Sequence, residues 1–191
     1  MPIKKLSLIL LTFLLLQGCV PLVIGGAATA TYFIIHDRRK SSTKKADEKL
    51  QSTVEQKLNQ DPRFQNECHT VVSTFRGTVL LAGQCPNKEL QKQAGRIVST
   101  APGIVRLYNE ITIEAPNSTL TRASDEWITT KIQLSLHNQN SLKNAEFQIV
   151  TENGVVFLMG NVTKTQANTI VSVVRKVDGV QKVVKMFTYT A

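Results

Sequence analysis

The sequence has few of the residue types on which metal and catalytic sites depend. It contains three cysteines and three histidines among 191 residues, and His36, His69 and His137 share no motif. No nucleophile elbow, Walker loop, HExxH or CxxC motif is present. These absences argue against a metal site, a cofactor, a small-molecule substrate and an enzyme. The 42% hydrophobic fraction, with 10 glycines and 6 prolines, excludes collagen and a wholly disordered chain.

Negative charge is also scarce. The chain has 23 Lys and Arg against 14 Asp and Glu, which gives a formal net charge of +9. A basic protein of this size usually associates with a polyanion, either nucleic acid or an anionic membrane surface. Composition alone does not choose between the two.

The N-terminal segment indicates which of these two polyanions is the partner. Residues 6–16 form an apolar run after Lys4 and Lys5, which is typical of a secretory signal and too short for a transmembrane helix. The run ends in the sequence Leu16-Gln17-Gly18-Cys19, which resembles the lipobox of bacterial lipoproteins. That resemblance implies a signal peptide over 1–18 and a lipidated Cys19. In such lipoproteins an aspartate directly after the cysteine is associated with retention in the inner membrane. Because Val20 stands at that position here, the resemblance implies the periplasmic face of the outer membrane. Nucleic acid is therefore excluded as a partner.

Residues 19–45 are predicted to be a tether. The stretch 20–35 is apolar and rich in small residues, and it fits either a tether near the bilayer or a membrane-inserted segment. A flexible basic linker follows, which is either solvated or attracted to anionic lipid. Its cations are Arg38, Arg39, Lys40, Lys44 and Lys45.

The remainder of the chain is an internal repeat of about 70 residues. Glycines bracket a strand at 77–83 and again at 154–160, and each copy has a later glycine at 103 or 179. The apolar stripe of Leu50, Val54 and Leu58 recurs as Ile128, Ile132 and Leu136, with the i, i+4, i+8 spacing of a helix. The spacing predicts domains over 46–114 and 124–191, joined by a linker over 115–123.

Each copy reads helix, strand, strand, helix, strand. In the second copy Ser124 is expected to cap the first helix and Thr163 the second, and strands are expected at 145–152, 155–160 and 180–189. A hairpin followed by a strand–helix–strand crossover gives a three-stranded mixed sheet with two helices on one face. The predicted fold class is therefore α+β.

The hairpin of the first copy predicts a disulfide. If the turn lies at Arg76-Gly77, then Cys68 and Cys85 are directly opposed in a non-hydrogen-bonded pair, with Cα atoms ~4.5 Å apart. An oxidising periplasm favours the bridge. A strand bulge or free thiols are the alternatives. The second copy has Ala145 and Val162 at these positions, so the bridge supports only the first copy.

The paired glycine-bracketed hairpins with flanking helices resemble tandem BON domains. With the lipobox and the overall length, the chain resembles the dual-BON outer-membrane lipoproteins. That family implies a non-enzymatic protein that binds anionic phospholipid and maintains outer-membrane integrity, with enrichment at division sites. It also implies that the first helix of the second domain contacts lipid.

That helix has suitable residues for lipid contact. Trp127, Lys131 and Leu134 share a face beside the buried stripe, and an indole suits the membrane interface. The alternative is that Trp127 packs between the two domains. The alternative function is an adaptor that uses the BON sheets to dock an envelope assembly protein or a cell-wall component. Further candidates for lipid contact are Arg122, His137 and Lys143.

Overall fold

The computed structural model describes residues 33–34 and 39–190. The predicted signal peptide, Cys19 and most of the apolar stretch 20–35 lie outside the described residues. Within the described residues, no helix combines the length and apolarity needed to cross a membrane.

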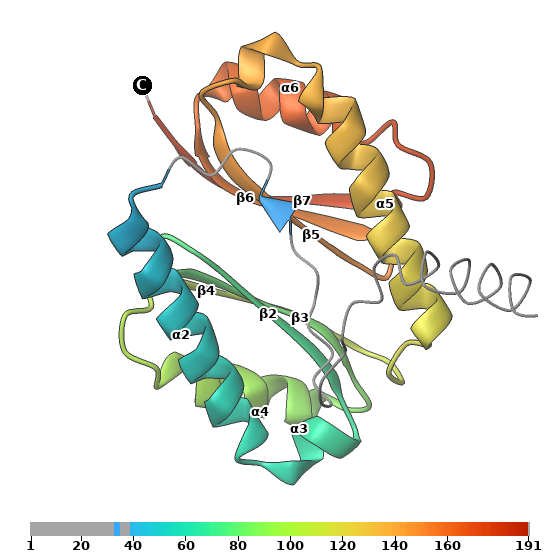
Figure 1. Ribbon diagram of the computed structural model, residues 1–191. Coiled ribbons are helices and arrows are strands. Elements are labelled where there is room, and N and C mark those ends of the chain that lie inside the picture. The colour runs from blue at the N-terminus through green and yellow to red at the C-terminus, as the bar shows by residue number, and fades with distance from the viewer. Residues whose placement is uncertain (1–32, 35–38, 191) are drawn as a thin grey trace, which may run out of the picture.

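The first repeat has the predicted order of elements around a three-stranded sheet (Figure 1). The sheet order is β2-β3-β4, with β2 antiparallel and β4 parallel to β3. A short helix, α3, is an addition to the predicted order. The elements are α2 (Ser41–Asn59), α3 (Pro62–Asn66), β2 (His69–Phe75), β3 (Thr78–Cys85), α4 (Lys88–Ser99) and β4 (Arg106–Ile113).

The second repeat has the same order, with one extra strand. The two-residue strand β1 (Phe33–Ile34) pairs antiparallel with β5 and makes the sheet order β1-β5-β6-β7. Part of the predicted tether is therefore an edge strand, which the sequence did not reveal because two residues carry no periodic signal. The other elements are α5 (Thr119–His137), a 3-10 turn (Asn140–Leu142), β5 (Glu146–Glu152), β6 (Val155–Val162), α6 (Lys164–Val174) and β7 (Lys182–Tyr189).

Both first helices begin earlier than predicted. The helix α2 begins at Ser41, inside the predicted tether. The helix α5 begins at Thr119, and its cap is Ser118 rather than Ser124; the Ser118 Oγ accepts the Thr121 N–H at 3.1 Å. The buried stripe starts at Ile128, in the third turn of α5, so the buried stripe does not mark the first two turns. The predicted cap of α6 is correct, because Thr163 forms a capping box with Gln166.

The two hairpins have the predicted turns and register. Arg76 and Gly77 have φ of 49° and 74°, and Asn153 and Gly154 have φ of 50° and 73°, as a two-residue turn with positive φ requires. In the first hairpin His69 pairs with Gln84, and the next pair outward is Cys68 and Cys85. These cysteines form the predicted disulfide, with Cα atoms 4.5 Å apart.

The repeats pack sheet against sheet, with the helices on the outside (Figure 1). Each sheet buries one face under its own helices. The other faces meet in a third apolar cluster, which draws Val71, Phe75, Leu80 and Ala82 from the first repeat and Val150, Phe157, Met159 and Met186 from the second. The sheet faces that the adaptor hypothesis needs therefore cover each other, and the sheet edges and helix surfaces remain on the outside of the described residues.

Candidate functional site

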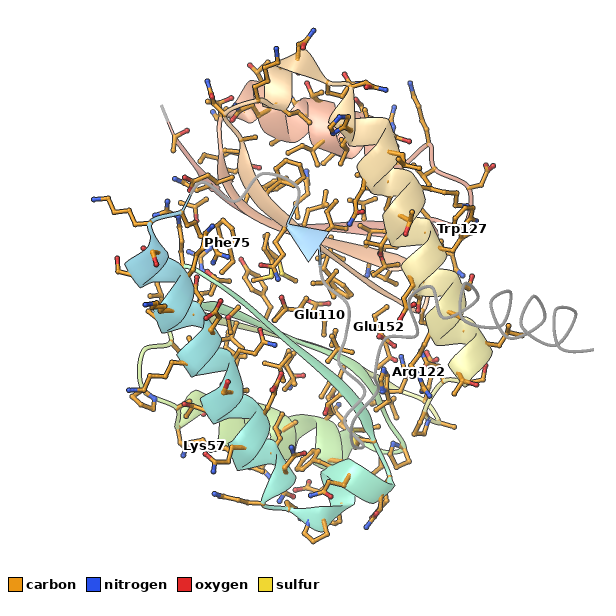
Figure 2. All side chains as sticks on the ribbon, viewed as in Figure 1. Lys57, Phe75, Glu110, Arg122, Trp127 and Glu152 are labelled. Atoms are coloured by element: carbon orange, nitrogen blue, oxygen red, sulfur yellow. A yellow bond between two sulfur atoms is a disulfide. The ribbon has the colours of Figure 1, made fainter. Side chains whose placement is uncertain are left out.

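Three large apolar side chains lie in a row on the outer surface of α5. Leu120, Trp127 and Leu134 are 80%, 61% and 65% exposed. A spacing of seven residues is close to two helical turns, so the three side chains share one face. This row, here named the α5 stripe, points away from the buried side of the helix (Figure 2, where Trp127 is labelled). An apolar row exposed on a folded protein marks an interaction surface.

The α5 stripe contains two of the predicted residues and one that the sequence analysis missed. Trp127 is exposed rather than buried between the repeats, so the hypothesis of inter-domain packing is wrong. Leu120 was missed because it was assigned to the linker. Its signal was the seven-residue spacing to Trp127.

Two of the cations predicted to contact lipid make hydrogen bonds within the protein instead. The Lys131 Nζ donates a hydrogen bond to the Asp178 carbonyl oxygen. The Arg122 guanidinium donates to the Asn117 backbone and side-chain oxygens at 3.0 and 3.3 Å. His137 and Lys143 are exposed, beyond the C-terminal end of the stripe.

The basic linker is partly a structural element. Arg39 is buried, and its guanidinium forms an ion pair with Asp47 and lies over the Phe75 ring, 4.6 Å from the centroid. It is therefore neither solvated nor directed at lipid. Lys40 and Lys45 are exposed, as a membrane-directed or solvated role requires.

A buried aspartate on the first helix of each repeat holds the hairpin turn. Asp47 accepts the backbone N–H groups of Arg76 and Gly77 at 2.8 and 2.9 Å. Asp125 accepts those of Asn153 and Gly154 at the same two distances. Each aspartate stands three positions before the first residue of the buried stripe, a signal that the sequence analysis did not use. The helix thereby fixes the turn in both repeats.

The carboxyl of Asp125, the clamp of the second repeat, has a perturbed pKa. Burial raises the pKa of Asp125 above its ordinary value, and the negative charge of Glu152 adds to the rise. The two backbone N–H donors and His69 lower it without cancelling the effect of burial.

This shift predicts a pH dependence of stability. A carboxyl whose pKa is raised by folding stabilises the protein most below its unfolded pKa, and that contribution is lost as the pH rises through the folded pKa. We expect the free energy of unfolding of the wild type, relative to Asp125→Asn, to fall as the pH rises from about 3 to about 7. Urea unfolding across this range measures it. A difference that does not change with pH would contradict the assignment.

A second polar cluster joins the two repeats. Glu152, 7% exposed at the end of β5, accepts hydrogen bonds from Gln84 Nε2 at 2.9 Å and Asn117 Nδ2 at 2.7 Å. Its other oxygen lies 3.5 Å from His69 Nε2. One carboxylate of the second repeat thus contacts the first repeat and the connection. Figure 2 shows Glu152 beside the N-terminal part of α5, the helix that carries Arg122.

A small pocket between the repeats does not offer a ligand site. Its volume is about 80 Å³, room for two or three water molecules, and Phe75, Arg106 and Met186 are among its lining residues. Within the part of the chain that the structure describes, no group of three or more His, Cys, Asp or Glu side chains could hold a metal ion. The α5 stripe is therefore the most distinctive candidate for binding.

Comparison with known proteins defines the class first. The family model for the BON domain matches residues 46–115 and 124–191. The two repeats are therefore BON domains, arranged in tandem.

The full-length relatives are more specific. The chain is 36% identical over 188 residues to the outer membrane lipoprotein DolP of Haemophilus influenzae, covering 98% of this chain and 97% of that protein. It is 35% identical over 153 residues to a 21 kDa hemolysin of Actinobacillus pleuropneumoniae, covering 80% and 79%. The chain belongs to the DolP family of BON-domain outer membrane lipoproteins, as the resemblance in its sequence predicted.

A much weaker structural likeness is to the C-terminal domain of CdsD from the Chlamydia trachomatis type III secretion system. It has a TM-score of 0.30 and 11% identity, covering 72% of this chain and 96% of that one. The family relationship, in contrast, confirms the predicted localisation at the outer membrane.

Proposed function

We propose that the protein binds anionic phospholipid through the α5 stripe of its second BON domain, and that it is not an enzyme. The observation that supports this most directly is the row of Leu120, Trp127 and Leu134 on one outer helix face. Through this contact the protein would maintain outer-membrane integrity, at division sites among others, as the family resemblance implies.

Two membrane contacts, the lipid anchor at Cys19 and the α5 stripe, would act together. A lipidated Cys19 would hold the domains close to the bilayer, so that contact by α5 becomes an intramolecular step with a high effective concentration. Two membrane signals together anchor a protein more firmly than either one. Leucine and tryptophan side chains partition into the interface. Removal of the predicted signal peptide takes away Lys4 and Lys5 and lowers the net charge from +9 to +7, which still favours an anionic surface.

Vesicle binding tests the proposal. Full-length protein should co-sediment with phosphatidylcholine vesicles that contain phosphatidylserine, and much less with phosphatidylcholine alone. The difference should shrink as ionic strength rises, because salt screens exposed charges beyond about 10 Å at 0.1 M. A form without acyl groups on Cys19 removes the contribution of the lipid anchor, so that the binding of the folded domains and their basic tether is measured.

The alternative function is a protein-binding adaptor. Since the sheets cover each other's faces, a partner protein would have to dock on the α5 stripe or on a sheet edge such as β4 or β7. Absence of binding to either vesicle, with a specific envelope protein recovered by cross-linking through α5, would replace the lipid hypothesis with this one.

A further inference from the structure

The disulfide lies directly beside the polar cluster at Glu152. His69 and Gln84, which contact the Glu152 carboxylate, are a cross-strand pair of the first hairpin. The adjoining pair is the Cys68–Cys85 bridge. The covalent bond holds the strands β2 and β3 together where the hairpin would otherwise fray. It therefore sets the separation of the two side chains that receive Glu152.

The cluster continues to the start of α5. The Asn117 backbone N–H donates to Gln84 Oε1 at 3.2 Å, and its side-chain amide donates to Glu152. Asn117 in turn accepts two hydrogen bonds from Arg122, in the first turn of α5. Ser118, the cap of α5, follows Asn117 directly. The first turn, which carries Leu120, is thus connected to the first repeat by a chain of hydrogen bonds.

We propose that Glu152 is a positioning residue for the α5 stripe. Through Asn117 it holds the first turn of α5, and the first BON domain with its disulfide thereby determines how the stripe is presented to the membrane. This inference rests on the proposed function for its consequence in lipid binding. The connection between Glu152 and the start of α5 is independent of the proposed function.

Hydrogen exchange of the full chain tests the connection. Glu152→Ala removes the oxygen that accepts the hydrogen bonds of Gln84 and Asn117. In this variant the amide protons of Asn117, Thr121 and Arg122 should exchange about tenfold faster or more, because their local opening becomes easier. The double variant Cys68→Ala/Cys85→Ala should show the same local effect. Combining the substitutions should add little, because both act through one cluster.

A matched control is Glu146→Ala. Glu146 also joins the repeats, by an ion pair with Arg76, but it lies at the opposite end of β5. This variant should leave exchange at 117–122 unchanged. Unchanged exchange in Glu152→Ala, or equal acceleration in Glu146→Ala, would overturn the proposal. Thermal unfolding of each variant establishes that it is folded.

Vesicle binding gives the second readout. Glu152→Ala should weaken binding to the phosphatidylserine-containing vesicles about fivefold or more, although Glu152 lies away from the stripe. Normal binding in a variant with accelerated exchange would overturn the positioning role. If the wild type binds no vesicle, the proposed function fails, and the exchange result still decides whether Glu152 holds the helix.

Discussion

Replacing Trp127 with glutamate should abolish binding to anionic vesicles and leave the fold intact. The side chain is 61% exposed and makes no part of the three apolar clusters, so the free energy of unfolding should change by less than about 0.5 kcal/mol. At the membrane, a carboxylate replaces the largest apolar group of the stripe and meets anionic headgroups. Co-sedimentation should show at least about a tenfold loss of affinity, equivalent to 1.4 kcal/mol.

The matched control is Val105→Glu. Val105 is another strongly exposed apolar residue, but it lies in the first domain, before β4. This variant adds the same charge and should retain vesicle binding. Equal loss in both variants would show a general effect of charge, and full binding by the Trp127 variant would remove the α5 stripe from the site. Leu120→Glu extends the test to the residue that the sequence analysis missed.

Replacing Asp47 with alanine should destabilise the protein by about 3–5 kcal/mol. The substitution leaves the buried Arg39 guanidinium without its carboxylate and the turn N–H groups of Arg76 and Gly77 without their acceptor. Removal of one partner from a buried ion pair costs more than the pair itself contributes, because the remaining charge stays out of water. Urea unfolding measures the loss.

The repeat supplies the control for this prediction. Asp125→Ala removes the same two turn acceptors, and the structure gives no arginine among the contacts of its carboxylate. It should therefore cost only about 1–3 kcal/mol. The variant Arg39→Met/Asp47→Ala, which removes both charges, should be more stable than Asp47→Ala. If Asp47→Ala and Asp125→Ala lower the free energy of unfolding equally, the unpaired Arg39 contributes nothing to the destabilisation.

Much of this architecture could be predicted from short-range patterns. The turn residues Asn153 and Gly154 specify a hairpin because both tolerate positive φ. Once the turn at Arg76 and Gly77 is placed, the strand register follows, and with it the pairing of Cys68 with Cys85. The two buried stripes identified the first helix of each domain, and Trp127 was assigned to the correct face.

Several features could not be predicted in this way. The sequence predicts Arg39 in a basic linker that is either solvated or attracted to lipid, since nothing in its neighbourhood indicates that it pairs with a buried carboxylate on α2. Arg122 was assigned to lipid, yet its guanidinium binds Asn117. Glu152 was not singled out, because its partners in the first domain are 68 or more positions away.

Local periodicity, turn chemistry and cysteine spacing thus specified two α+β domains, their hairpin register and the helix that carries the single tryptophan. These properties depend on neighbours within a few residues. Tertiary structure decided that the two sheets cover each other and that Arg39 and Arg122 serve the fold. It also decided that the α5 stripe is the apolar helix face left in solvent. Those outcomes depend on contacts between residues far apart in the chain, whose partners no short sequence pattern identifies.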